Sequence, residues 1–140
     1  MSSSYYKNME IWKVSYDLVL DIYRIDKNFP EEEKKTLVSQ LKRAAISIPL
    51  NIAEGSSRMT NKEFLYFINY AFGSAKEVEV LLNLSRDLKF IDNKKFSELH
   101  SKLDHLMAKL FSFMGYLEKK CESKKMKFFR KFRIEEWKPN

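Results

Sequence analysis

The sequence contains few of the residues that turns, disulfides and membrane spans require. Its 140 residues include three glycines and three prolines, too few for the many turns of an all-β fold. The single cysteine, Cys121, cannot form an internal disulfide, and no apolar run reaches the roughly 18 residues of a membrane-spanning helix. Because the N-terminus also lacks an apolar segment, we expect no signal peptide and a reducing, cytoplasmic location.

Patterns of catalytic and metal-binding residues are also missing. The sequence has no Gly-rich phosphate loop, no Gly-x-Ser-x-Gly and no His-Glu-x-x-His. His100 and His105 are five positions apart, so they do not share a helix face as a metal-binding pair would. We therefore expect no cofactor, no metal site and no enzymatic activity.

Hydrophobic residues recur at helical spacing in four segments, 10–27, 31–54, 60–88 and 92–120. The clearest pattern is in the last segment, where an a/d seam is formed by Leu99, Leu103, Leu106, Leu110, Phe113 and Leu117. Four such helices with short connections predict an all-α, antiparallel up-down-up-down four-helix bundle. The expected organisation is a flexible N-terminus (1–9), the bundle (10–120) and a basic, aromatic-rich C-terminal tail (121–140).

Two of these helices contain unusual residues. Pro49 removes the hydrogen bond to the carbonyl of Ala45, so we expect a bend there, with the helix continuing to about Glu54 and Gly55 as its C-terminal cap. In the third helix Gly73 lies among other small residues. A glycine there costs about 1 kcal/mol relative to alanine, so we expect a neighbouring helix to approach its backbone closely.

The net charge of +7 is concentrated at the C-terminus. Residues 119–140 hold nine Lys/Arg against three Asp/Glu, a net of +6, whereas residues 1–118 hold 17 against 16, a net of +1. This asymmetry favours a polyanionic partner. The candidate nucleic-acid-binding residues are three cations of the bundle and six of the tail: Lys42, Arg43, Arg58, Lys124, Lys125, Lys127, Arg130, Lys131 and Arg133.

Two features have more than one interpretation. The aromatic residues of the first helix, Trp12, Tyr16 and Tyr23, can broaden the core face or form a subunit interface. The tail can bind nucleic acid through charge and stacking, lie on an anionic membrane, or pack its phenylalanines on the bundle or on a neighbouring subunit.

Several stretches of the sequence resemble one bacterial family. They are Arg43-Ala44-Ala45 through Ser47-Ile48-Pro49 to Asn51-Ile52-Ala53-Glu54-Gly55, then Lys62-Glu63-Phe64 through Phe67, Ala71 and Gly73-Ser74 to Glu77, the Trp12 region and the Phe29-Pro30 turn. Over about residues 9–118 the chain resembles the four-helix bundle proteins first described as encoded by intervening sequences within 23S ribosomal RNA genes. The tail lies outside this resemblance.

The resemblance implies an antiparallel bundle that assembles as a homopentamer and has no established enzymatic activity. Distant relatives, the accessory variability determinant proteins of diversity-generating retroelements, bind a reverse transcriptase and nucleic acid, which implies a reverse-transcriptase-like partner only weakly. We therefore expect a non-enzymatic, oligomeric protein that binds RNA or DNA through basic surface. The alternative is a protein–protein adaptor or structural oligomer with no nucleic-acid role.

Overall fold

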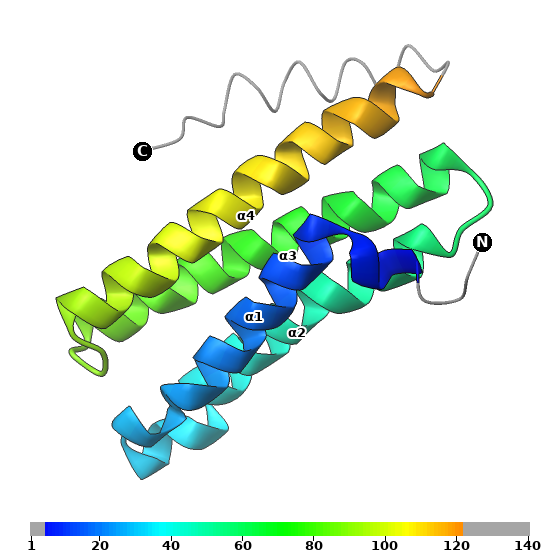
Figure 1. Cartoon of the computed structure of the whole chain (residues 1–140). Helices are drawn as coiled ribbons and strands as arrows, with labels where there is room; N and C mark the ends of the chain where they lie inside the picture. The colour runs from blue at the N-terminus through cyan, green and yellow to red at the C-terminus, as the bar shows by residue number, and fades with distance from the viewer. Residues whose placement is uncertain (1–4, 122–140) are drawn as a thin grey trace.

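The computed structural model describes residues 5–121, which contain four α-helices. Figure 1 shows these helices packed side by side. The α-helices are α1 (Glu10–Arg24), α2 (Leu37–Ser56), α3 (Asn61–Asp87) and α4 (Asn93–Lys119), with short 3-10 helices η1 (Tyr5–Asn8), η2 (Asp26–Asn28) and η3 (Glu31–Lys35). No strand occurs in this range. The predicted all-α class is confirmed.

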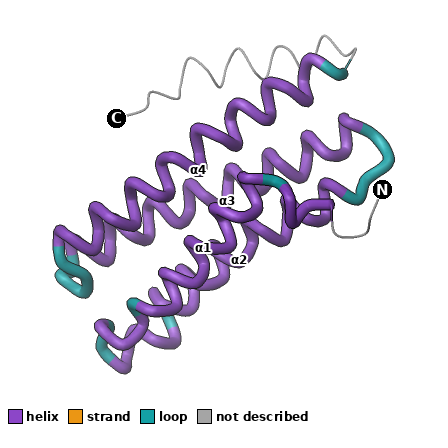
Figure 2. Tube along the Cα trace, viewed as in Figure 1, coloured by secondary structure: helices purple, strands orange, loops and turns teal. Residues whose placement is uncertain are grey.

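The helices follow one another around the bundle. α1 packs on α2, α2 on α3, α3 on α4 and α4 on α1, which is the predicted up-down-up-down arrangement. Figure 2 shows the short connections at both ends. The contact between α2 and α3 is the most extensive and that between α1 and α4 the least. None of the described helices combines the length and the apolar character needed to cross a membrane.

The predicted apolar stripes form the core. The five leucines of the α4 seam are each at most 3% exposed, while Phe113 is partly buried. They meet the inward residues of α1, which are Ile11, Ser15, Leu18 and Ile22. Each fully buried leucine contributes about 1.5–3 kcal/mol to folding. The helical spacing of apolar residues therefore predicted the inward face correctly.

The structure corrects the predicted limits of the first two helices. α1 ends at Arg24 rather than Lys27, and α2 begins at Leu37 rather than at Glu31. The acids expected in the first turn of α2 lie in η3, where they bond locally: Lys34 Nζ donates to Glu31 at 2.8 Å, and the Thr36 hydroxyl donates to Glu33 at 2.7 Å. Thr36, with φ −115° and ψ −92°, separates η3 from α2.

Two helical glycines have roles opposite to those predicted. Gly55 does not cap α2 but is buried within it, and a Cβ there would lie 2.7 Å from Phe67 Cβ and 2.8 Å from Phe64 Cδ2. Gly73, where close approach was expected, is exposed, and a Cβ there would meet no described neighbour within 4 Å. α2 and α3 therefore approach closely at Gly55. As predicted, α2 continues through Pro49.

Replacing Gly55 with alanine should destabilise the bundle, because the added methyl group would force α3 away from α2. We expect the free energy of unfolding to fall by about 1–3 kcal/mol, measured by urea denaturation followed by circular dichroism. Ser39→Ala, at an exposed position of the same helix, is the control and should not lower stability. An unchanged stability of Gly55→Ala would contradict the close approach.

Candidate nucleic-acid interface

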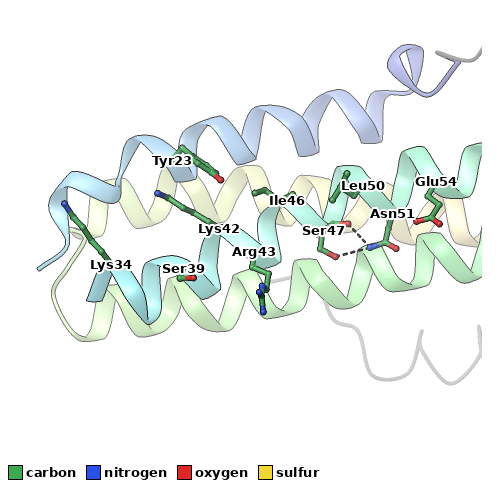
Figure 3. A pocket seen from close by; sticks show the side chains of 10 residues that line it. All are labelled: Tyr23, Lys34, Ser39, Lys42, Arg43, Ile46, Ser47, Leu50, Asn51 and Glu54. Carbon is green, nitrogen blue, oxygen red and sulfur yellow. Dashed lines mark hydrogen bonds between the residues drawn. The ribbon is translucent and has the colours of Figure 1, made fainter. Parts of the chain in front are cut away.

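The outer surface of α2 lines an open depression of about 680 Å³, shown in Figure 3. Its lining residues come from α1, η3 and α2, and are Tyr23, Lys34, Ser39, Lys42, Arg43, Ile46, Ser47, Leu50, Asn51 and Glu54. The depression thus contains two of the predicted nucleic-acid-binding residues. It combines cations, hydroxyl groups, one carboxylate and the exposed Leu50.

Lys42 is held within the protein. Its Nζ lies 2.8 Å from Asp26 Oδ2 and 4.5 Å from the centroid of the Tyr23 ring, and its side chain is 23% exposed. The contact connects α2 to η2 and to α1. A phosphate group at this position would compete with the Asp26 carboxylate for the Lys42 ammonium. The main role of Lys42 is therefore to hold α1 against α2, and phosphate binding is secondary.

The other two predicted cations of the bundle have different surroundings. Arg58 pairs with Glu54 at 2.6 Å and lies over the Phe67 ring, 4.7 Å from its centroid. Arg43 is exposed and makes no ion pair with a described residue. The six candidates from Lys124 to Arg133 lie outside the described residues. Among the predicted bundle cations, Arg43 thus has its charge most available.

A polar cluster that the sequence did not predict joins α2 to α3. Ser47 Oγ and Ser74 Oγ are 2.8 Å apart. Asn51 Nδ2 donates to the Ser47 carbonyl at 2.7 Å and lies 3.0 Å from Ser47 Oγ. These hydrogen bonds give the polar atoms partners within the protein. The bond between the two serines also fixes how far α2 and α3 are shifted along each other.

Both histidines and Lys34 make contacts with carboxylates at the surface. His100 Nε2 lies 3.5 Å from Glu79 of α3, whereas His105 Nε2 lies 3.8 Å from Glu10 of α1, so the two histidines do face different helices. The hydrogen bond and charge of Glu31 raise the pKa of Lys34, an ammonium that is thus firmly cationic at neutral pH. Among residues 5–121, no group of three His, Cys, Asp or Glu side chains is placed to hold a metal ion.

The predicted interface aromatics of α1 have partners in the same chain. Trp12 stacks on Tyr16, with ring centroids 4.9 Å apart, and makes a T-shaped contact with Tyr6 of η1, whose ring centroid is 5.1 Å away. Tyr23 lies under Lys42. Tyr16 and Tyr23 are still about half exposed, at 48% and 46%, so each also presents apolar surface outward.

A family model for the 23S rRNA-intervening sequence protein matches residues 7–112. The chain belongs to the 23S rRNA-intervening sequence protein family. The match covers α1, α2, α3 and most of α4, including the stretch around Pro49 on which the resemblance was based.

A solved structure shares the fold of this 23S rRNA-intervening sequence family member. It is a protein of unknown function from the S23 ribosomal protein family of Bacteroides thetaiotaomicron VPI-5482, with a TM-score of 0.70 and 21% sequence identity, covering 74% of this chain and 97% of that chain. At this identity the similarity shows the fold alone. No curated protein matches the sequence.

Lys42→Met should destabilise this family member, because it leaves Asp26 without its cation and removes the contact with Tyr23. We expect a loss of about 1 kcal/mol at low salt, measured by urea denaturation, and a smaller loss at high salt, where screening has already weakened the pair. Lys35→Met is the control, since Lys35 is exposed and has no ion pair with a described residue. Equal effects of the two changes would contradict a structural role for Lys42.

Proposed function

We propose that this protein is a non-enzymatic, cytoplasmic homo-oligomer that binds RNA or DNA through basic surface at one end of the bundle. The observation that carries the proposal is that the basic C-terminal segment continues from the end of α4. Residues 119–140, with a net charge of +6, begin at the C-terminal end of α4.

The same end of the bundle carries further exposed cations. Arg58 and Lys62 flank the α2–α3 connection, and Figure 1 draws this connection at the same end of the bundle as the end of α4, where residues 119–140 begin. Cations that neutralise phosphate groups release condensed counterions, which makes such a surface a general site for nucleic acid. The tail adds aromatic residues between its cations, and these side chains can stack on unpaired bases.

The non-enzymatic part of the proposal rests on the available side chains. The two histidines of the sequence each contact a carboxylate at the surface, on different sides of α4. Neither histidine hydrogen-bonds to a serine, threonine or cysteine side chain among the described residues. Binding by charge needs no such constellation.

Several copies would increase the affinity of a modest basic surface. The family resemblance implies a homopentamer, and linking several weak sites raises the effective concentration of each one for a long polyanion. An assembly of this kind binds structured RNA or DNA without a deep pocket. Light scattering together with the 260/280 nm absorbance ratio of the purified protein reports both the mass and any bound nucleic acid.

The alternative is an adaptor that binds an acidic protein, and the weakly implied reverse-transcriptase-like partner belongs to this class. The exposed apolar side chains of the bundle, such as Tyr70 and Val80, are the observation that favours it. A pull-down treated with nuclease separates the two functions, because an adaptor retains its partners and a nucleic-acid-binding protein loses those held through RNA or DNA.

Binding to a labelled structured RNA should weaken at least about tenfold between 50 and 200 mM salt, because several counterions are released. Changing the six tail cations Lys124, Lys125, Lys127, Arg130, Lys131 and Arg133 to glutamine should weaken binding to a similar extent and flatten the salt dependence. Fluorescence anisotropy measures both effects.

The matched control changes exposed lysines at the opposite end of the bundle, Lys27, Lys35, Lys89 and Lys94, to glutamine. This variant should bind RNA within about twofold of the wild type, since its cations are far from the proposed surface. Binding that is unaffected by salt, or an equal loss in both variants, would argue against the proposal.

A further inference from the structure

α3 carries a second apolar stripe on the face opposite its core. The core stripe consists of Ile68, Ala71, Ala75, Val78 and Leu82, each 0% exposed. Two positions away along the helix runs an outward stripe at alternating spacings of four and three: Tyr66, Tyr70, Gly73, Glu77, Val80 and Leu84. Two positions correspond to about 200° around a helix with 3.6 residues per turn, so the stripes lie on opposite sides of α3.

The outward stripe is exposed along its whole length. Tyr70 is 63% and Val80 60% exposed, and Leu88, just beyond the helix, is 54% exposed. A surface helix normally has one apolar face, directed at its own core. Large apolar side chains that follow a heptad pattern on the outer face mark a place where another helix packs.

Gly73 lies near the middle of this stripe. Because it has no side chain, the backbone of another helix can come close to α3 at this position. A glycine inside a helix is destabilising relative to alanine. At Gly55 a described neighbour occupies the space, but at Gly73 no described atom lies within 4 Å of the position of a Cβ. The space at Gly73 therefore suits a backbone from outside the protomer.

Two charges of opposite sign, neither in an ion pair with a described residue, lie at nearly the same level of this surface. The Ser47–Ser74 contact places these residues at one level on the antiparallel α2 and α3. Because the helices are antiparallel, moving four residues back along α2 corresponds to moving four residues forward along α3. Arg43 on α2 therefore lies at the same height along the bundle as position 78 of α3, one residue from Glu77. Arg43 and Glu77 are both exposed, and neither makes an ion pair with a described residue.

We propose that this outer α2–α3 surface is a contact between copies of the chain, in which Arg43 of one copy pairs with Glu77 of the next. The inference rests on the homo-oligomer of the proposed function and names the surface through which it assembles. A rotation axis parallel to the helices leaves each residue at its own level along the bundle. When α2 of one copy faces α3 of the next, the arginine and the glutamate therefore meet.

The surface is large enough for a stable contact. At a rise of 1.5 Å per residue, the stripe from Tyr66 to Leu84 is about 27 Å long. With α2 beside α3 the surface is about 20 Å wide, which gives roughly 540 Å² per copy and about 1,080 Å² for the pair, above the ~1,000 Å² expected of a biological interface. The proposal also removes Arg43 from the nucleic-acid candidates and makes it an interface residue.

A charge-swap series tests the pairing. Arg43→Glu and Glu77→Arg should each weaken association at least tenfold, measured as the dissociation constant by analytical ultracentrifugation, because each places like charges in contact. The double variant should restore the wild-type mass, since it exchanges the two partners. Singles that assemble like the wild type, or a double variant that stays dissociated, would overturn the pairing.

Gly73→Gln tests the close approach independently of charge. Its side chain enters open space in the protomer, so circular dichroism should show an intact fold while light scattering shows dissociation. Ser101→Gln, at an exposed position on α4, is the matched control and should retain the wild-type mass. A Gly73→Gln variant that assembles normally would overturn this interface but leave the homo-oligomer standing.

A monomeric wild type would overturn both the interface and the proposed assembly, and would indicate a different occupant, such as the chain's own residues 122–140 or another protein. Nucleic-acid binding is scored separately by the salt titration of the tail variant. Loss of RNA binding in the tail variant, with the oligomer unchanged, would show that the two proposals depend on different surfaces.

Discussion

The close contact of α2 with α3 is the constraint on which the rest of the bundle depends. At Gly55 no side chain separates α2 from Phe67, and a single methyl group would lie 2.7 Å from Phe67 Cβ. Farther along, the Ser47 and Ser74 hydroxyl groups meet at 2.8 Å. Together these contacts set the spacing and the level of the two helices, and α1 and α4 complete the core around them.

The charges near α2 have partners outside the α2–α3 contact. Lys42 and Arg58 are engaged by Asp26 and Glu54, so most of the charge near the outer surface of α2 is balanced within the protein. The basic surplus lies instead in residues 119–140. Binding of a polyanion and contact between copies can therefore use separate surfaces, one at the end of the bundle and one along its side.

Much of the fold could be predicted because helical periodicity reports directly on burial. The α4 leucines and the inward residues of α1 are buried as their spacing indicated. The start of α2 could not be predicted, since the break before it is a single non-helical residue, Thr36 at φ −115° and ψ −92°, which no residue pattern marks. On α3 the stripe through Ile68, Ala71 and Val78 is buried, whereas the second stripe through Tyr70 and Val80, with the same helical spacing, lies on the outer face.

By itself, the sequence determined the fold class, the family and the inward face of each helix, because these depend on which residues are apolar and how often they recur. Only the tertiary structure decided which glycine permits close approach. Gly55 and Gly73 both lie within helices, yet one faces Phe67 and the other open space. It also decided that Arg43 lies within one residue of the level of Glu77. The relative position of two antiparallel helices depends on how their side chains pack against each other, and spacing within one helix carries no information about the other.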